Sequence, residues 1–254
     1  MKKFLLVILL IIDFISVPEI IRAQDDYGFR FVRVIYDDVY RGFRGGSNNF
    51  FQGFRGRGGR GGRGMWATDY PTADLNLHKA IKRTTKIPIV GEPLALSFND
   101  PKIFEYPFVM ITEPGFWLTN DEEVKNMQKY FARGGFMLID DFHDFGGKGP
   151  QWYNMYNNIK RVFPDREPVW LDKNHPIWSI YYDIDPSEAP STKPGFTKYD
   201  CQYYAIYDDK GRMMCVICYN QDIGDGWEWP ASLAEASTVS FQMGINFIIY
   251  ALTH

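Results

Sequence analysis

The stretch GGFMLIDDFHDFGG, residues 134–147, decides the fold of this chain. Its run FMLID, residues 136–140, is continuously apolar up to its last position, which is typical of a strand buried on both faces of a sheet. Three aspartates and a histidine then occupy five positions, namely Asp140, Asp141, His143 and Asp144. Such residues at the end of a buried strand form either a catalytic cluster or a polar loop that caps the strand.

The segments before this strand repeat the same kind of structure. The run YPFVMIT, residues 106–112, is a second continuous apolar stretch. Between the two runs, a capping-box pattern at residues 119–122 precedes apolar residues at helical spacing up to residue 132. Strand, helix and strand joined by short links form a βαβ unit, so the two strands are predicted to be parallel.

The rest of the chain also alternates between helix and strand. A first strand is predicted at residues 29–38, and a helix from Ala73 with Thr72 as its N-cap. A helix over residues 151–163, two strands within residues 203–220 and a closing helix over residues 232–252 follow. The pattern predicts an α/β domain, a three-layer sandwich with a mainly parallel central sheet.

Polar residues follow three of the predicted strands. In open parallel sheets, ligands bind in the crevice beyond the carboxyl ends of the strands. We therefore expect one crevice to gather Glu113, the residues after FMLID, and residues of the stretch NQDIGDGWE, 220–228. The predicted catalytic residues are Asp141 and His143, and the predicted ligand-binding residues are Glu113, Asp140, Asp222, Trp227 and Glu228.

Several of these residues have more than one possible role. Asp141 and His143 are two positions apart, so they suit general acid–base work or service as two metal ligands, and the pattern leaves the metal and any cofactor open. Asp140 could instead cap a helix, and Trp227 could pack in the core. The stretch 220–228 superficially resembles a calcium loop, but Gly224 stands at the fifth ligand position, which excludes an EF-hand.

The cysteines favour burial over redox chemistry. Cys215 and Cys218 have the spacing of a redox pair, but they lie in a strand-like run where positions three apart face opposite ways. We interpret them as small buried hydrophobes. A disulfide between Cys201 and one of the others stays open.

The first residues predict export. Lys2 and Lys3 precede the apolar run 4–12, and Ile21 and Ala23 fit the positions before a cleavage site. We expect a signal peptide at residues 1–23, with an uncleaved anchor as the alternative, and a periplasmic or cell-envelope location without a transmembrane span after cleavage. A single domain then spans residues 24–254.

An Arg/Gly-rich segment, residues 41–64, interrupts this domain. It holds six arginines and no acidic residue, whereas the whole chain has a net charge of −3. Such a composition favours a flexible loop insertion between the first strand and the helix. Arg-Gly repeats also occur in RNA-binding segments, but an acidic body and predicted export argue against a nucleic-acid partner. Weak adhesion to anionic polymers at the cell surface is the remaining functional alternative.

The chain contains, in this order, the motifs YPFVMITEPGF, NDEEVKNMQKYF, GGFMLIDDFHDF, RVFPDREPVWLDKNHPIW, DDKGRMMCVICYNQDIGDGWE and MGINFIIYALTH. Together they resemble the bacterial family called domain of unknown function 4159 (DUF4159), and the resemblance runs from about Tyr27 to the C-terminus. It implies a flavodoxin-like fold, similar to class I glutamine amidotransferases and, more remotely, to trehalose-utilisation-like proteins. In amidotransferases a cysteine occupies the sharp turn after a buried strand. Here that turn is Asp140–His143, without a cysteine.

These observations lead to three functional hypotheses. The first is an exported domain that binds a small molecule or an envelope protein in the crevice, without cysteine-dependent amidotransferase activity. The second is a hydrolase that acts on an envelope sugar or peptide derivative, with Asp141 as base or nucleophile and His143 as its proton partner. The third is a structural envelope component without a site.

Overall fold

The computed structural model describes residues 27–39 and 64–254. The predicted signal peptide, residues 1–23, and all but the last residue of the predicted insertion 41–64 lie outside the described residues, so both stay predictions. Among the helices of residues 27–39 and 64–254, none is long and apolar enough to cross a bilayer.

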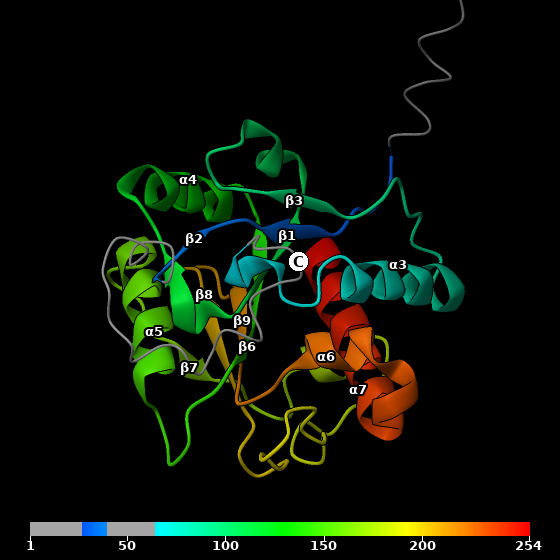
Figure 1. The fold of residues 1–254 in the computed structure, drawn as a ribbon. Helices are drawn as coiled ribbons and strands as arrows, with labels where there is room; N and C mark the ends of the chain where they lie inside the picture. The colour runs from blue at the N-terminus through cyan, green and yellow to red at the C-terminus, as the bar shows by residue number, and fades with distance from the viewer. Residues whose placement is uncertain (1–26, 40–63) are drawn as a thin grey trace, which may run out of the picture.

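A seven-stranded sheet forms the centre of the described part of the chain (Figure 1). Its order is β3 (Leu94–Leu96), β1 (Val32–Val34), β4 (Phe108–Thr112), β6 (Phe136–Phe142), β9 (Met213–Tyr219), β8 (Gln202–Tyr207) and β7 (Val169–Trp170). The strands from β3 to β9 are parallel, whereas β8 is antiparallel to both of its neighbours. A small antiparallel pair, β2 (Asp37–Asp38) and β5 (Trp117–Leu118), lies outside this sheet.

The strand predicted from FMLID lies in the middle of the sheet. β6 pairs with β4 from Phe108↔Phe136 to Thr112↔Asp140, and its other edge pairs with β9. Every residue of β6 is buried. The sequence of this strand does not alternate between apolar and polar residues because both faces of the sheet are buried there. β6 continues two residues beyond the predicted end, through Phe142.

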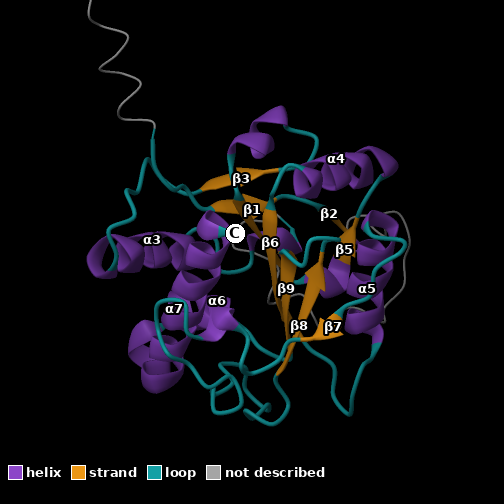
Figure 2. Ribbon diagram, turned by 180° about the vertical axis from the view of Figure 1, so that it is seen from behind, coloured by secondary structure: helices purple, strands orange, loops and turns teal. Residues whose placement is uncertain are grey.

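Helices cover both faces of the sheet (Figures 1 and 2). One face carries α4 (Asp121–Ala132) and α5 (Pro150–Val162), and the other carries α3 (Thr72–Thr84), α6 (Ile223–Glu228) and α7 (Pro230–Thr253). The predicted α/β class and three-layer sandwich are confirmed. Short 3-10 helices complete the described elements: η2 (Met65–Ala67), η3 (Pro101–Glu105), η4 (Pro114–Phe116) and η5 (Pro176–Trp178).

Alternate residues of β6 enter two separate cores. Met137 and Ile139 pack in the core beneath α4 and α5, whereas Phe136 and Leu138 pack in the core beneath α3 and α7. A fully buried side chain of this size contributes about 1.5–3 kcal/mol. The strand is thus held from both sides, which fixes the backbone that presents Asp140 and Asp141.

Two helix starts differ from the prediction. α3 begins at Thr72 and has Pro71 at its N-cap position, so Thr72 is not the N-cap. The capping box of α4 joins Asn120 to Glu123, one residue later than predicted. The sequence allows a capping box from Thr119 to Glu122 as well as one from Asn120 to Glu123. Thr119 instead bonds Asn158 and Arg161 of α5, which leaves the capping role to Asn120.

The cysteines match the prediction of buried, separate side chains. Cys215 packs in one core and Cys218 in the opposite core, as expected for positions three apart in β9. All three cysteines, Cys201 included, are free and buried. Burial raises the pKa of the Cys201 thiol to about 12, so this thiol is protonated at neutral pH.

Candidate functional site

The carboxyl ends of three adjacent strands carry residues with a left-handed backbone. Glu113 follows β4 with φ of 51°, Asp141 lies near the end of β6 with φ of 61°, and Asn220 follows β9 with φ of 57°. Asp69, before α3, has φ of 63°. Each such residue costs of order 1 kcal/mol or more, and residues of this kind cluster at functional sites. The chain therefore turns sharply where the predicted crevice lies.

Asp141 is the centre of the site. Its side chain is 1% exposed and its Oδ1 lies 3.1 Å from Lys193 Nζ and 3.7 Å from His143 Nδ1. Thr112 of the neighbouring β4 donates from Oγ1 to Asp141 Oδ2 over 3.5 Å. Burial alone would raise the pKa of Asp141, but Lys193 and His143 outweigh burial and lower it. Asp141 is thus a buried carboxylate.

Lys193 bridges Asp141 and Asp222. Its Nζ also lies 3.3 Å from Asp222 Oδ2, although its side chain is only 15% exposed. Burial would lower the pKa of Lys193, but the carboxylates of Asp141, Asp222 and Glu113 raise it, so the ammonium stays charged. Sequence reasoning missed Lys193, because it belongs to an irregular segment and has no motif.

Asp222 opens α6 and completes the bridge. Its Oδ1 accepts a hydrogen bond from the backbone N–H of Asp225 over 2.9 Å. Burial and the charge of Asp141 raise the pKa of Asp222 well above its usual value. The pKa of Asp141 is lowered and that of Asp222 is raised, so Asp141 is the stronger acid of the two.

Asp140 points to the α6 side of the sheet. Its Oδ2 accepts a hydrogen bond from the N–H of Gly224 over 3.1 Å. Its Oδ1 is buried without a hydrogen-bond partner. Burial, reinforced by the charge of Asp141, raises the pKa of Asp140 well above its usual value. Asp140 thus contacts the start of a helix, as in its structural alternative, but one oxygen is unused.

Asp69 joins the cluster from a distant part of the sequence. Burial and the charges of Asp141 and Asp225 raise its pKa well above its usual value. Its Oδ2 is buried without a hydrogen-bond partner. Sequence reasoning missed Asp69, since it precedes a helix and follows no predicted strand.

The other predicted residues have different places. Glu113 is buried, and its charge acts on Lys193. Glu228 is half-buried at the end of α6, and its charge acts on Asp69 and Asp225. Trp227 does not line the cluster. Its indole is fully buried in the core, where it donates to the carbonyl of Ser240 and packs edge-on against Phe31.

His143 lies under an aromatic cover. Its side chain is 8% exposed, and its backbone N–H donates to Gln151 Oε1 of α5. The His143 ring packs against Phe196, which in turn stacks on the exposed ring of Phe145 at 4.5 Å. The segment that carries Lys193 and Phe196 thus covers the polar cluster at the carboxyl ends of the strands.

Two sets of side chains have the geometry to hold a cation. One ligand atom each from Asp141, His143 and Asp222 lie within 4.8 Å of one another, and the same holds for Asp69, Asp222 and Asp225. The first set has the mixed nitrogen and oxygen donors that borderline metals accept. Lys193 bonds two of its members. The second set offers carboxylate oxygens alone.

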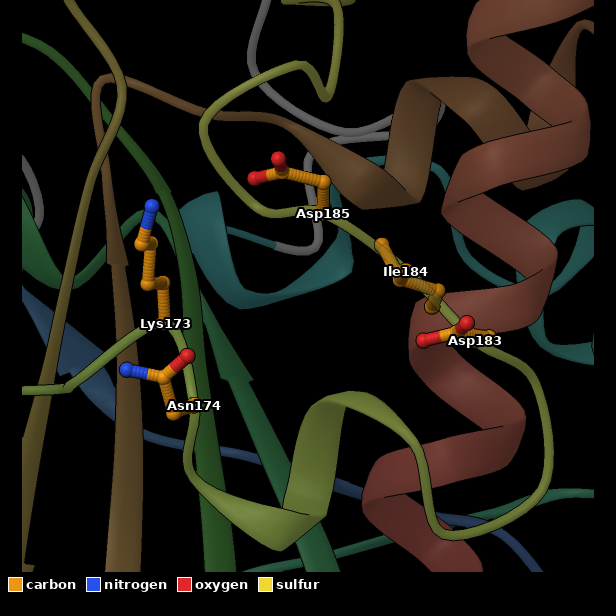
Figure 3. Close-up of a pocket in the computed structure, with 5 residues that line it drawn as sticks. All are labelled: Lys173, Asn174, Asp183, Ile184 and Asp185. Atoms are coloured by element: carbon orange, nitrogen blue, oxygen red, sulfur yellow. The ribbon is translucent and has the colours of Figure 1, made fainter.

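A surface depression lies elsewhere. It has a volume of about 440 Å³ and is lined by five residues. Figure 3 shows Lys173 and Asn174 on one side of it and residues 183–185 on the other. None of the predicted site residues lines it. The candidate site therefore rests on the buried cluster.

The chain matches the family model described as domain of unknown function (DUF4159) over residues 58–252. The match covers most of the chain, so the protein belongs to the DUF4159 family, as its motifs predicted. A search of curated protein sequences finds no match.

Proposed function

We propose that this DUF4159 domain binds a small molecule through a positively charged ammonium group, which occupies the position of Lys193 Nζ between Asp141 and Asp222. The observation that carries the proposal is the bridge itself: one ammonium contacts two buried carboxyl groups at 3.1 and 3.3 Å. Lys193 is the internal counterpart of the ligand. A small molecule fits this role better than an envelope protein, because the carboxyl groups lie beneath a cover.

The residues that surround the ammonium support this reading. A buried carboxylate is costly without a cation, so the pocket selects positive charge. Lys193 reaches the site from a segment of neither helix nor strand. The neighbouring Thr192 holds this segment through its backbone N–H and the side chain of Gln221. A segment outside the helices and the sheet can yield its ammonium position to a ligand more readily than an element of the sheet.

Chemical rescue of a lysine variant tests the proposal. Lys193→Ala removes the internal ammonium and leaves room for a free one. We expect ethylammonium to raise the melting temperature of Lys193→Ala by several degrees at millimolar concentration and to leave the wild type almost unchanged, because binding to the folded state alone stabilises it. The measurement is a thermal-shift titration.

Two further samples make the outcome specific. The double variant Asp141→Asn/Lys193→Ala should lose the rescue, since its pocket lacks the carboxylate. Asp165→Asn removes one negative charge, as Asp141→Asn does, but at an exposed position, so it should behave as the wild type. Equal stabilisation of all four proteins by ethylammonium, or of none, would refute the proposal. A screen of amines found in cell envelopes on Lys193→Ala would then identify the natural ligand class.

The proposal also covers the cellular location. The basic start and apolar run of residues 2–12 support export to the periplasm or cell envelope. Fractionation of cells followed by N-terminal sequencing should find a chain that begins near residue 24. Recovery of the intact chain from the cytoplasm alone would contradict this part.

A hydrolase is the second candidate, favoured by the position of Asp141. Its left-handed backbone marks a sharp turn at the end of a central strand, and His143 lies within 3.7 Å. A carboxylate with a lowered pKa is a weak base at neutral pH, so Asp141 would act as nucleophile. Turnover of chromogenic esters or glycosides that Asp141→Asn abolishes would support this candidate, and turnover that survives the change would end it.

A further inference from the structure

Three carboxylates converge on one glycine at the start of α6. A Cβ atom placed on Gly224 would lie 2.9 Å from Asp69 Oδ2, 3.5 Å from Asp222 Oδ1 and 3.9 Å from Asp140 Oδ2. These are the three nearest heavy atoms at that point. A Cβ here would displace the Asp69 carboxylate, whereas its distances to the Asp222 and Asp140 oxygens are ordinary contacts. Glycine therefore keeps space between carboxylate oxygens.

Two buried oxygens beside this space have no hydrogen-bond partner. They are Asp69 Oδ2 and Asp140 Oδ1, and Asp140 is fully buried as a residue. Arg33 is a nearby cation whose charge acts on both acids, but its guanidinium pairs with Asp74 and donates to the carbonyl of Thr68. Its Nε is also buried without a partner, so it donates to neither of these oxygens. Buried polar atoms are normally satisfied. Oxygens left over in a group of acids point to a missing cation.

The spacing of the acids fits one ion. Asp69, Asp222 and Asp225 each offer an oxygen within 4.8 Å of the other two. Two oxygens that bind one ion at about 2.4 Å lie at most about 4.8 Å apart, so the spacing of these three oxygens meets this requirement for a shared ion. The bridge to Lys193 uses Asp222 Oδ2, whereas Asp222 Oδ1 faces Gly224.

We infer that Asp69, Asp222 and Asp225 bind a hard divalent cation such as Mg²⁺, Mn²⁺ or Ca²⁺, beside Gly224 and next to the ammonium position. Oxygen donors alone select hard cations over zinc or copper. Water molecules would complete the coordination. The site adjoins the proposed ammonium pocket and shares Asp222 with it, but it does not depend on a small-molecule ligand.

Titration with Mn²⁺ tests this site on the purified protein. Electron paramagnetic resonance reports the free ion, and the wild type should bind one Mn²⁺ per chain. Gly224→Ala should weaken binding at least about tenfold, because its Cβ displaces the Asp69 carboxylate. Asp225→Asn should weaken it to a similar degree through loss of one ligand charge. Asp225 is half-buried, so this variant is the safer one for folding.

The exposed Asp165→Asn serves as the matched control and should bind Mn²⁺ within about twofold of the wild type, since it leaves every ligand in place. Circular dichroism confirms that each variant is folded. Failure of the folded wild type to bind Mn²⁺ at millimolar concentration, or unchanged affinity in Asp225→Asn, would overturn the inference. Ethylammonium rescue of Lys193→Ala is measured in the same preparation. Rescue without Mn²⁺ binding would refute the metal site alone. Mn²⁺ binding without rescue would refute the ammonium pocket alone.

Discussion

Lys193 and Asp141 form an ion pair in which both side chains are largely withdrawn from water. Breaking a buried pair by removal of one partner typically costs about 3–5 kcal/mol, and Asp222 remains as a second partner, so we expect Asp141→Asn to lower the free energy of unfolding by about 1–3 kcal/mol. In a double-mutant cycle with Lys193→Met, urea unfolding should give a coupling energy of about 1 kcal/mol or more.

The pair of Arg166 and Asp209 at the surface provides the comparison for this cycle. The Asp209 side chain is 92% exposed and that of Arg166 is 30% exposed, so the coupling energy between Arg166→Met and Asp209→Asn should stay below about 1 kcal/mol. Equal coupling in the two pairs would mean that the Lys193 bridge is no stronger than a surface contact. The bridge could then not serve as the template for a ligand.

A buried histidine links stability to pH. His78 Nε2 accepts a hydrogen bond from the N–H of Phe31 over 2.9 Å, and the residue is 6% exposed. Burial, assisted by the charge of Arg30, lowers the pKa of His78 from 6.5 to about 4. The unfolded state binds a proton at higher pH than the folded state. The contribution is therefore complete above pH 6.5 and is lost as the pH falls towards 4.

We expect His78 to account for about 1–2 kcal/mol of the stability that the wild type loses between pH 7 and pH 4. His78→Gln keeps a side-chain acceptor for the Phe31 N–H and has no proton to gain. Its free energy of unfolding, measured by urea titration across this range, should fall less steeply than that of the wild type. Parallel slopes for the two proteins would contradict the assignment.

At the scale of elements, Asp144 fastens the first turn of α5 to the end of β6. Its two oxygens accept hydrogen bonds from the backbone N–H groups of Gln151 and Trp152, and Tyr219 of β9 donates to it from its hydroxyl. Loss of a side chain that caps a helix start costs about 1 kcal/mol, and here a strand contact is lost as well. We expect Asp144→Ala to lower the free energy of unfolding by about 1–2 kcal/mol.

Hydrogen exchange locates that effect. The amide protons of residues 151–153 should exchange faster in Asp144→Ala, whereas those of α4 should keep their protection, because Asn120 and Glu123 cap that helix independently. Asp144→Asn, which retains one acceptor oxygen, should show an intermediate change. An effect spread evenly over both helices would mean that Asp144 acts on the whole fold.

The elements that could be predicted are those whose pattern is local. Continuous apolar runs identified β4 and β6, because burial on both faces removes alternation. β3 and β7 were missed because they have only three and two residues, too few for a period to show. The capping frame of α4 was off by one, since the sequence fits two frames and a tertiary contact of Thr119 chooses between them.

Some residues of the candidate site could be predicted from the sequence and others could not. Topology alone brings four predicted residues to one end of the sheet, because they lie at the end of a strand or shortly after it: Asp140, Asp141, His143 and Asp222. Asp69 and Lys193 lie far from these residues in the sequence and in segments without a motif, and only the folded chain brings them in. Trp227 lies in the core and not in the cluster, because its indole packs beneath α7 and donates to the carbonyl of Ser240.

At the scale of the whole molecule, the folded sheet includes residues that lie before the start of the DUF4159 match. The match begins at residue 58, whereas β1 spans residues 32–34 and lies inside the sheet, paired with β3 on one side and β4 on the other. Residue Arg33 of this strand is the buried ion-pair partner of Asp74 in α3. A strand outside the matched range therefore holds together elements within it.

We predict that a chain starting at residue 58 does not form a stable fold. Removal of β1 unpairs two strands and withdraws buried apolar side chains at about 1.5–3 kcal/mol each. It also leaves the carboxylate of Asp74 buried without its cation, which typically costs about 3–5 kcal/mol. These losses together reach the 5–15 kcal/mol of a whole domain. Thermal unfolding followed by circular dichroism should show a cooperative transition for residues 24–254 and none for residues 58–254. If the shorter chain melts cooperatively near the same temperature, β1 is dispensable and the fold is set by the matched range alone.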